Sequence, residues 1–418
     1  MKKSSNISGF YKLGIQERRE LLKEFADLSD EDLGAGLSLE SGDRMIENVI
    51  TLFPLPLGIA TNFLINGRNY LIPMVLEEPS VVAAASNSAR IARKKGGFHA
   101  TSDDPVMIGQ IQLTDVEDPS MSRIKILEAK GDIIEKANDQ DPLLVKLGGG
   151  AVDLEVKIVE IKSEAMVIVH LLVNVKDAMG ANAVNTMCEA VAPMVEKLGG
   201  GKVTLRILSN LATHRLARAR AVFDKDLLGG DEVVEGIYKA YKFADADPYR
   251  CATHNKGIMN GIDALAIATG NDFRAIESGA HSFASLDGYH SLTHYEVNEN
   301  GDLVGSIELP MACGTIGGAT SSHPVAKLSL KILKVESSQE LAQVMASLGL
   351  AQNLAALRAL ASEGIQKGHM ALHARNIAVM AGAEGEEIDI VSKILVDEGN
   401  VRVDRAKEIV QEMRNSST

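Results

Sequence analysis

The segment Glu77–Ser80, Glu-Glu-Pro-Ser, places two carboxyl groups directly before a run of small apolar residues. Acidic residues in such a position usually stabilise the N-terminus of a helix through the helix dipole. A carboxyl group buried against Val81 and the alanines that follow would instead have a raised pKa and could donate a proton. The pattern by itself favours the capping interpretation and leaves a proton donor as the alternative.

The segment His254–Asn260 contains a cation and an amide that could bind a substrate. Lys256 and Asn260 are four residues apart, so they lie on one face of the helix predicted there. A lysine at the start of a helix opposes the helix dipole, which favours a functional role for Lys256. Asp272 follows the same helix, and from the local sequence it is more typical of a helix cap.

Two glycine-rich loops could approach phosphate groups. In Lys176–Asn182, between a strand and a helix, Gly180 would let the helix N-terminus come close to an anion. The segment is not GxGxxG, and the acidic residue that usually follows such a motif is not evident, so an ordinary turn with Asp177 starting the helix stays open. The loop Gly314–Thr320 could hold another phosphate or cover a nicotinamide.

Two pairs of histidines have a spacing that metal sites use. His369 and His373 are four residues apart, but Met370 stands where an HExxH motif needs glutamate. His290 and His294 have the same spacing, again without a carboxylate between them. Because no third ligand is evident, we expect no metal.

The composition limits the class of protein. A chain of 418 residues with 45% hydrophobic residues predicts two or three globular domains. Its formal charge of −13 opposes general binding to nucleic acid or anionic membranes. The three cysteines form no CxxC pair, which fits a reducing cytoplasm. No signal peptide is visible, and the longest apolar stretch, Ala165–Val175, is too short to span a bilayer.

The middle of the chain predicts a compact unit of strands and helices. The expected elements are, in order, strand Val106–Leu113, helix Pro119–Ala137, strands Val152–Ile161 and Ala165–Val175, helix Ala181–Lys197 and strand Val203–Leu208. This β-α-β-β-α-β order is the ferredoxin-like split βαβ arrangement.

Helical patterns dominate the rest of the chain. They are expected at His254–Ala268, Phe273–His281, Glu340–Ala361 and Met370–Met380, with two short amphipathic helices in Glu386–Met413. We therefore expect an α+β protein with a large, mixed, helix-rich domain at 1–105 and 213–365. A small ferredoxin-like domain at 106–212 would be inserted in it, and a helical, mobile C-terminal flap would occupy 366–418.

Six short segments together resemble the class II, soluble bacterial form of 3-hydroxy-3-methylglutaryl-CoA (HMG-CoA) reductase. They are Glu47–Ile50, Glu77–Ser80, Asp177–Asn182, His254–Gly257, Gly270–Asp272 and Gly368–Met370. Each is short, but six in family order across nearly the whole chain make a specific signal.

The resemblance implies the residues of the site. The catalytic residues would be Glu78, Lys256, Asp272 and His369. The substrate carboxylate and hydroxyl would be held by Ser80, Arg250 and Asn260. The small domain would bind the cofactor through Asp177, Met179, Gly180 and Asn182, with Asp141 near the adenosine ribose. In the segment that would contact CoA, Phe10–Lys12 lacks the arginine of some members, and Lys12 could replace it.

The resemblance also implies the reaction, which is the reduction of (S)-HMG-CoA to (R)-mevalonate and CoA with two NADPH or NADH. Converting a thioester to an alcohol takes two hydrides and hence two cofactors. Lys256, held by Asp272, would stabilise the first oxyanion. His369 would protonate the departing CoA thiolate. Glu78 would protonate the aldehyde oxygen, provided that its pKa is raised.

The expected assembly is a homodimer with shared active sites, or a higher oligomer. Asp141 would repel a 2′-phosphate, whereas a biosynthetic role would favour NADPH, so the choice of cofactor stays open. Two other classes also stay open at this point. One is a zinc hydrolase that uses His369 and His373, and the other is a non-catalytic CoA-binding protein.

Overall fold

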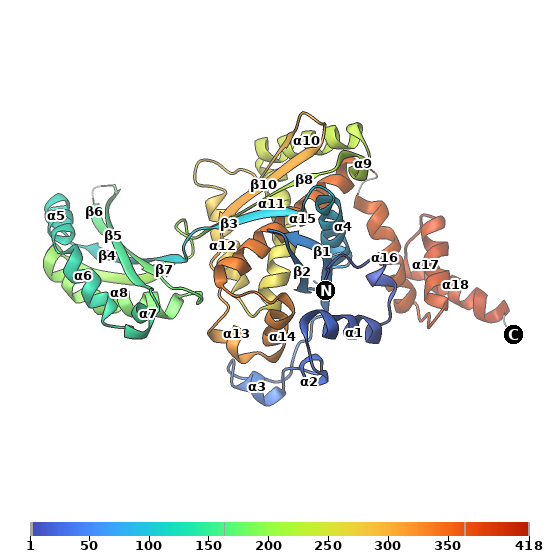
Figure 1. The fold of residues 1–418 in the computed structure, drawn as a ribbon, viewed down its shortest axis with the longest axis horizontal. Coiled ribbons are helices and arrows are strands. Elements are labelled where there is room, and N and C mark those ends of the chain that lie inside the picture. The colour runs from blue at the N-terminus through green and yellow to red at the C-terminus, as the bar shows by residue number, and fades with distance from the viewer. Residues whose placement is uncertain (1–2, 163, 363–364, 417–418) are drawn as a thin grey trace.

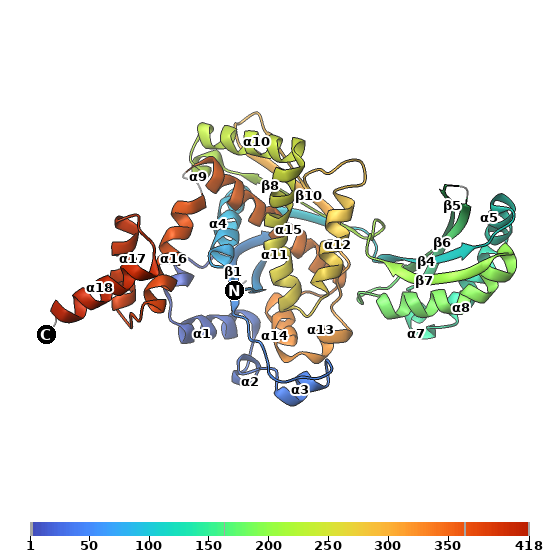
Figure 2. The same cartoon turned by 180° about the vertical axis from the view of Figure 1, so that it is seen from behind.

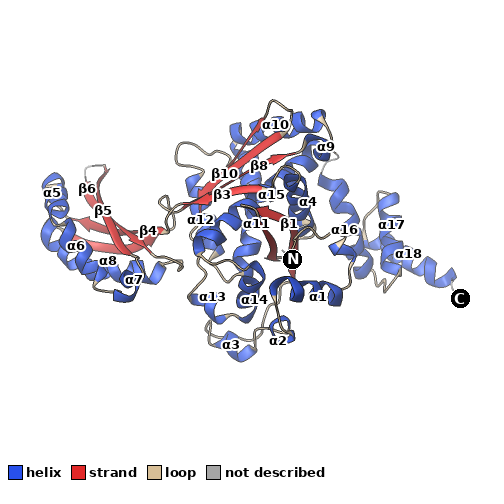
Figure 3. Cartoon of the chain, in the orientation of Figure 1, coloured by secondary structure: helices blue, strands red, loops and turns tan. Residues whose placement is uncertain are grey.

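The computed structural model describes residues 3–162, 164–362 and 365–416, and for residues 365–372 and 416 it describes the backbone alone. Figure 1 shows three parts in a row, with a small sheet-and-helix unit at one end and a large unit in the centre. The other end is formed by helices α16 (Ile365–Met380), α17 (Glu387–Asp397) and α18 (Val403–Ser416). Two separate sheets with helices packed on them confirm the expected α+β fold (Figure 3).

The central unit is built on a six-stranded sheet with the order β2-β1-β3-β8-β10-β9. The strands are β1 (Leu57–Ile65), β2 (Arg68–Val75), β3 (Phe98–Ser102), β8 (Leu216–Phe223), β9 (Thr293–Val297) and β10 (Leu303–Pro310). In β8, buried alanines alternate with Arg218 and Arg220, because successive side chains of a strand point to opposite faces. In the half of the sheet formed by β3, β8, β10 and β9, one face therefore packs on the core and the other face is polar, whereas β1 and β2 are buried on both faces.

The core helix of this unit is α15 (Ser338–Ala361), which packs against three strands of the sheet and most extensively against three further helices. Those helices are α4 (Val81–Arg93), α10 (Asp231–Ala246) and α11 (Pro248–Ala268). By length and composition α15 could cross a membrane, but 67% of its most apolar window is buried inside the protein. Helix α12 (Phe273–Phe283) runs beside α11 (Figure 2).

Helix α11 begins earlier than the predicted start at His254. Pro248 occupies a first-turn position, where its missing N–H would have had no partner, and the Asp247 carboxylate accepts the Arg250 N–H at 2.8 Å. Lys256 consequently lies inside the helix. The helix-dipole argument for its function was therefore wrong, and its role has to be argued from its contacts.

The small unit has a four-stranded antiparallel sheet with the order β5-β6-β4-β7. Its elements are β4 (Val106–Thr114), α5 (Pro119–Glu128), α6 (Lys130–Asn138), α7 (Pro142–Lys146), β5 (Gly150–Ile161), β6 (Glu164–Asn174), α8 (Ala181–Gly199) and β7 (Lys202–Ser209). This order is that of a split βαβ unit, as predicted. The single helix expected at Pro119–Ala137 is divided into α5 and α6 at Ala129.

The remaining elements cover the central unit. They are the 3-10 helix η1 (Phe10–Lys12) and helices α1 (Ile15–Ala26), α2 (Asp30–Leu33), α3 (Leu39–Asp43), α9 (Lys225–Leu228), α13 (Gly318–Ser322) and α14 (Pro324–Leu333). Helix α1 packs on α14 through a small apolar cluster of its own. The C-terminal helices α16, α17 and α18 share a separate apolar cluster.

Candidate active site

Two of the predicted catalytic side chains, Glu78 and Lys256, lie together in the central unit. The Lys256 Nζ atom is 3.4 Å from the Glu78 Oε2 atom. Lys256 belongs to α11 and Glu78 to the turn between β2 and α4, and α11 packs directly against β2. The Lys256 and Glu78 side chains are 60% and 39% exposed, so a substrate can reach both.

Ser80 ends the turn that carries Glu78. Its φ of 76° lies in the left-handed region, which residues other than glycine seldom adopt. Ser80 is the N-cap residue of α4, but its side chain makes no capping hydrogen bond. The Ser80 hydroxyl is therefore not committed to the helix and can serve a ligand.

A cavity of about 1130 Å³ opens beside Ser80. Its lining includes four cationic side chains, which are Lys12, Arg18, Arg19 and Arg90. Apolar residues of β1 and of α14 also line it. Cations of this kind recognise phosphate groups, and an apolar wall suits the uncharged arm of a long ligand.

The two remaining residues predicted to hold the substrate are in α11. Asn260 lies one turn beyond Lys256 on the same face, and it is half-buried. Arg250 lies near the start of the helix, more than one turn before Lys256, and is also half-buried. The helix thus brings Asn260 to Lys256 and leaves Arg250 further away.

Asp272 stands apart from Lys256 in the single chain. Its carboxylate caps α12 and accepts the Arg274 and Ala275 N–H groups, each at 3.1 Å. From Lys256 to the end of α11 at Ala268 the helix rises about 18 Å. Asp272 of the same chain therefore cannot hold the Lys256 ammonium group.

The loop between β6 and α8 carries three of the predicted cofactor residues, Asp177, Met179 and Gly180. Gly180 has a φ of 102°, and a Cβ atom there would lie 2.5 Å from the Val175 side chain, so the position requires glycine. No side chain caps α8, and Asn182 in its first turn is exposed. The first N–H groups of this helix can therefore receive a phosphate group, which fits a dinucleotide cofactor.

Asp177 and Met179 hold this loop against the central unit. The Asp177 carboxylate accepts the Ser338 N–H at 2.7 Å and so caps the core helix α15. The Met179 carbonyl oxygen accepts a hydrogen bond from Arg215 at 3.1 Å. Arg215, only 4% exposed, was missed in the sequence because nothing around an isolated arginine indicates its partners.

Asp141 begins the short helix α7. Its Oδ1 atom accepts the Leu144 N–H at 2.9 Å, and the residue is half-buried. One carboxylate oxygen is thus used as a helix cap, so a substitution at this position must preserve the cap if it is to report on the cofactor.

Comparisons with known proteins identify the family of this chain. A family model described as hydroxymethylglutaryl-coenzyme A reductase matches residues 14–374. The chain belongs to the HMG-CoA reductase family. The 3-hydroxy-3-methylglutaryl-coenzyme A reductase of Archaeoglobus fulgidus is 63% identical over 416 residues, which cover 99% of this chain and 95% of that protein. A probable HMG-CoA reductase of Borreliella burgdorferi is 38% identical and covers 87% of this chain and 84% of its own length.

Similarity to a solved structure identifies the class of HMG-CoA reductase. The class II HMG-CoA reductase of Streptococcus pneumoniae, bound to NADPH in open conformations, matches with a TM-score of 0.82 and 43% identity. The match covers 96% of this chain and 100% of that chain. The prediction of a class II reductase that depends on a nicotinamide cofactor is thereby confirmed, and the hydrolase and non-catalytic alternatives are set aside.

The structure also contains a polar cluster near Lys256 that the sequence did not predict. Asp263 lies seven residues after Lys256 in α11 and approaches Glu277 of α12. The His281 Nε2 atom is 2.9 Å from Glu277 Oε2, and its Nδ1 atom is 2.9 Å from the Tyr289 hydroxyl. Burial and the neighbouring Glu277 raise the pKa of Asp263, whereas His281 lowers the pKa of Glu277. Glu277 is thus the ionised member of the pair.

His369, the fourth predicted catalytic residue, belongs to α16, but its side chain lies outside what the structure describes. His373 on the same helix is exposed. Among the residues whose side chains are described, no three histidine, cysteine, aspartate or glutamate side chains gather as a metal ion would require.

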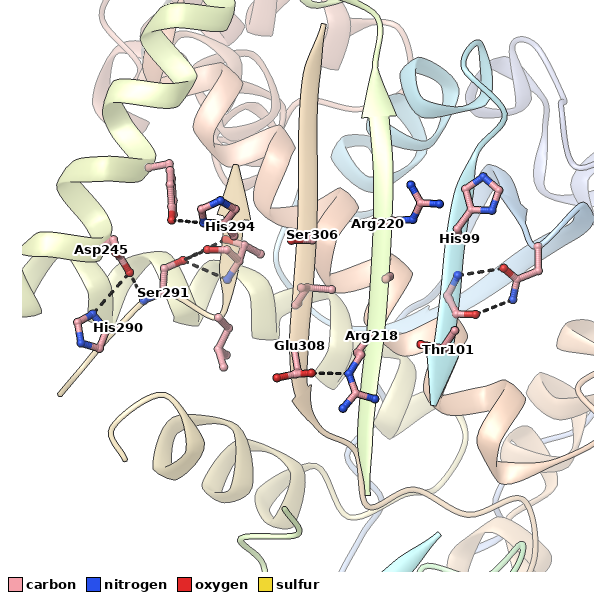
Figure 4. A pocket seen from close by; sticks show the side chains of 17 residues that line it. His99, Thr101, Arg218, Arg220, Asp245, His290, Ser291, His294, Ser306 and Glu308 are labelled. Carbon is pink, nitrogen blue, oxygen red and sulfur yellow. Dashed lines mark hydrogen bonds and ion pairs between the residues drawn. The ribbon is translucent and has the colours of Figure 1, made fainter. Parts of the chain in front are cut away.

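A second cavity, of about 840 Å³, lies on the polar face of the six-stranded sheet (Figure 4). Four of its lining residues are paired in register across strands β9, β10, β8 and β3, and form one row. They are His294, Ser306, Arg220 and His99. Arg218 in the next row pairs with Asp103 at 2.6 Å and with Glu308. Among the described residues that line this cavity, none belongs to the predicted site of the reductase.

Proposed function

We propose that the reductase converts (S)-HMG-CoA to (R)-mevalonate and CoA, with two NADPH or NADH per turnover, at a site built from Glu78, Lys256, Asp272 and His369. The observation that carries this proposal is the Lys256–Glu78 pair, 3.4 Å apart. A cation and a carboxyl group this close together can act on one carbonyl oxygen.

The substrate arm lies in the cavity beside Ser80. Lys12, Arg18, Arg19 and Arg90 supply the charges that the CoA phosphates require. The Ser80 hydroxyl, the Asn260 amide and the Arg250 guanidinium bind the carboxylate and hydroxyl at the other end of the substrate. In this proposal Lys12 replaces the arginine that Phe10–Lys12 lacks.

Each protein group has a task in the two reductions. When bound, the nicotinamide cofactor supplies the hydride. Lys256 stabilises the oxyanion that forms on the thioester oxygen. His369 gives a proton to the departing thiolate, since imidazole titrates nearest to neutrality. Glu78 then protonates the oxygen of the aldehyde in the second reduction.

The cofactor lies on the small unit, which we propose as a discrete domain at 106–212 inserted between 1–105 and 213–365. The N–H groups at the start of α8 hold its pyrophosphate. Gly180 lets the backbone approach, and Asn182 and Met179 line the same surface. Asp141 lies beside the adenosine ribose. Residues 366–418 form the flap that brings His369 to the substrate.

The active site is shared between two subunits of a homodimer or of a higher oligomer. Glu78 of the same chain is 3.4 Å from Lys256 but has the task of giving up a proton. A second carboxylate is therefore needed to hold the Lys256 ammonium group, and the Asp272 carboxylate of its own chain is too far away. In the proposed dimer, Asp272 of the partner subunit takes that place. Each chain then contributes Glu78 and Lys256 to one site and Asp272 with the cofactor loop to the other.

We also propose that the reductase works in the cytoplasm. The three cysteines are free and buried, as a reducing compartment allows. The charge of −13 disfavours anionic membranes and nucleic acid as partners.

The first test is an assay of nicotinamide oxidation with HMG-CoA as substrate, in wild type and in Lys256→Ala. Wild type should consume two reduced cofactors per mevalonate formed, and Lys256→Ala should lose most of this activity. A Lys256→Ala variant that reduces HMG-CoA at the wild-type rate would contradict the proposed site.

A further inference from the structure

Three loops from distant parts of the chain meet where the small unit joins the central one. They are residues 176–180 before α8, residues 269–272 between α11 and α12, and residues 312–317 before α13. The first carries the proposed cofactor residues and the second carries Asp272. The contacts through the third loop therefore decide whether these two parts of the site are mechanically connected.

Asn271, the neighbour of Asp272, joins the second and third loops. Its side-chain amide makes two hydrogen bonds to the backbone of Gly314. The Gly314 N–H donates to Asn271 Oδ1 at 2.7 Å, and Asn271 Nδ2 donates to the Gly314 carbonyl at 3.1 Å. Asn271 Nδ2 also donates to the Thr269 hydroxyl at 2.9 Å, which fixes the orientation of the amide.

Gly314 in turn lies directly against the cofactor loop. A Cβ atom at this position would be 2.6 Å from the Met179 nitrogen, so alanine would displace the loop. The next residue, Thr315, donates its N–H to the Asp177 carbonyl at 2.8 Å. The third loop is therefore in contact with the cofactor loop through backbone atoms.

Arg215 fixes the same junction from inside the protein. Its guanidinium donates to the carbonyl oxygens of Ala178, Met179 and Cys313. Two of these acceptors belong to the cofactor loop, and Cys313 directly precedes Gly314. Loops held by a buried guanidinium and by backbone hydrogen bonds move together rather than separately.

We propose that Asn271 is a positioning residue that couples the cofactor loop to Asp272 through Gly314. This inference rests on the proposed function, in which both belong to the same half of the shared site. A bound cofactor that orders residues 177–182 thereby fixes the backbone at 271 and 272. Asp272 then meets Lys256 of the partner subunit in the correct place when cofactor is present.

The test uses the single variants Asn271→Ala and Gly314→Ala and the double variant that combines these two changes. Each is compared with Asp272→Ala. Asn300→Ala, which changes an exposed turn residue, is the matched control. Asn271→Ala should lower kcat by on the order of 10²-fold, the cost of misplacing a catalytic group by about 1 Å. It should also weaken NADPH binding, measured by fluorescence, while HMG-CoA binding and the melting temperature stay near wild type. The double variant should be no slower than the slower single variant, because both changes break one contact.

Three results separate the possible failures. If Asp272→Ala keeps full activity, the proposed site itself is wrong. If Asp272→Ala is inactive but Asn271→Ala keeps its kcat, the coupling is wrong. If the two single effects multiply in the double variant, Asn271 and Gly314 act independently, which also overturns the coupling. Mixed dimers add a readout that simple destabilisation would not give. Dimers of one Asn271→Ala chain and one Lys256→Ala chain should recover activity, whereas dimers of one Asn271→Ala chain and one Asp272→Ala chain should not.

Discussion

Lys256 and Asp272 are separated by a long stretch of helix α11. The helix rises about 18 Å from Lys256 to its last residue, Ala268, and Asp272 lies beyond that end. Lys256 is instead 3.4 Å from Glu78 of the same chain. A site that needs all three side chains on one substrate therefore has to take Asp272 from a second copy. In an isologous dimer this exchange happens twice and creates two equivalent sites.

Mixing inactive variants tests this division of the site. In a mixed dimer of Lys256→Ala and Asp272→Ala chains, one site receives both substitutions and the other receives neither. Random exchange of equal amounts makes about half of all dimers mixed, so about a quarter of the wild-type activity should return. The measurement is the rate of nicotinamide oxidation before and after exchange.

The control is the mixture of Lys256→Ala with Glu78→Ala. The 3.4 Å contact places both residues in the same half of the site, so each site of a mixed dimer keeps one damaged residue and no activity returns. Recovery in this control, or none in the first mixture despite complete exchange, would contradict the assignment.

Asp141 tests the choice between NADH and NADPH. Its carboxylate caps α7, so Asp141→Asn is the informative change, because asparagine caps a helix about as well and removes the charge. Losing a charge beside the 2′-phosphate should shift the ratio of kcat/KM values towards NADPH, by about 1 kcal/mol or more at protein dielectric. Asp139→Asn, two residues earlier on the exposed surface, is the control. An unchanged ratio in Asp141→Asn would mean that another residue selects the cofactor.

Local patterns in the sequence predicted the four strands and helix α8 of the small unit, but they missed α7 and the break between α5 and α6. The alternation in β4, β5 and β6 and the glycines before β5 and at both ends of α8 are short-range signals, and the βαββαβ order follows from them. The start of α11 was missed because its first two turns have a weak apolar period, although Asp247-Pro248 is a readable cap.

The site could be predicted only in part. Glu78 and Lys256 are 178 residues apart, and only the resemblance to a family joined them before the structure did. Arg215 has no local signal, and the glycine-rich loop that begins at Gly314 indicated a ligand rather than a contact with the cofactor loop, because the partners of both residues are backbone atoms of distant loops. Asp263 lies on the Lys256 face at a helical spacing that is visible in the sequence, but its partner Glu277 belongs to another helix. Long-range pairs of this kind need the tertiary fold.

Lowering the pH should destabilise the folded reductase, partly because His254 is protonated in the unfolded chain. This side chain is buried against Ser291 and Thr293, and burial, with a contribution from Arg250, lowers its pKa to about 3. The unfolded chain takes up this proton near pH 6.5, whereas the folded chain does not, so stability is lost as the pH falls below that value. The loss from this group is at most about 1.4 kcal/mol per pH unit.

His254→Gln should remove this contribution and flatten the dependence of the free energy of unfolding on pH between about 6.5 and 5. Urea denaturation at several pH values measures the slope. His99→Gln, an exposed histidine on β3, should leave the slope as in wild type. An unchanged slope in His254→Gln would mean that the side chain is protonated when folded.

His369 should separate the two reductions. Its proposed task is to protonate the CoA thiolate, and free mevaldehyde has no thiolate to expel. His369→Gln should therefore lose thioester reduction by roughly 10²–10⁴-fold, the usual contribution of a general acid, and keep much of its mevaldehyde reduction. The two rates are measured by nicotinamide oxidation with HMG-CoA and with mevaldehyde. His373→Gln, an exposed histidine four residues further along α16, should keep both activities. If His369→Gln loses both reductions equally, His369 acts in a step common to the two hydride transfers, and the thiolate leaves with a proton from elsewhere.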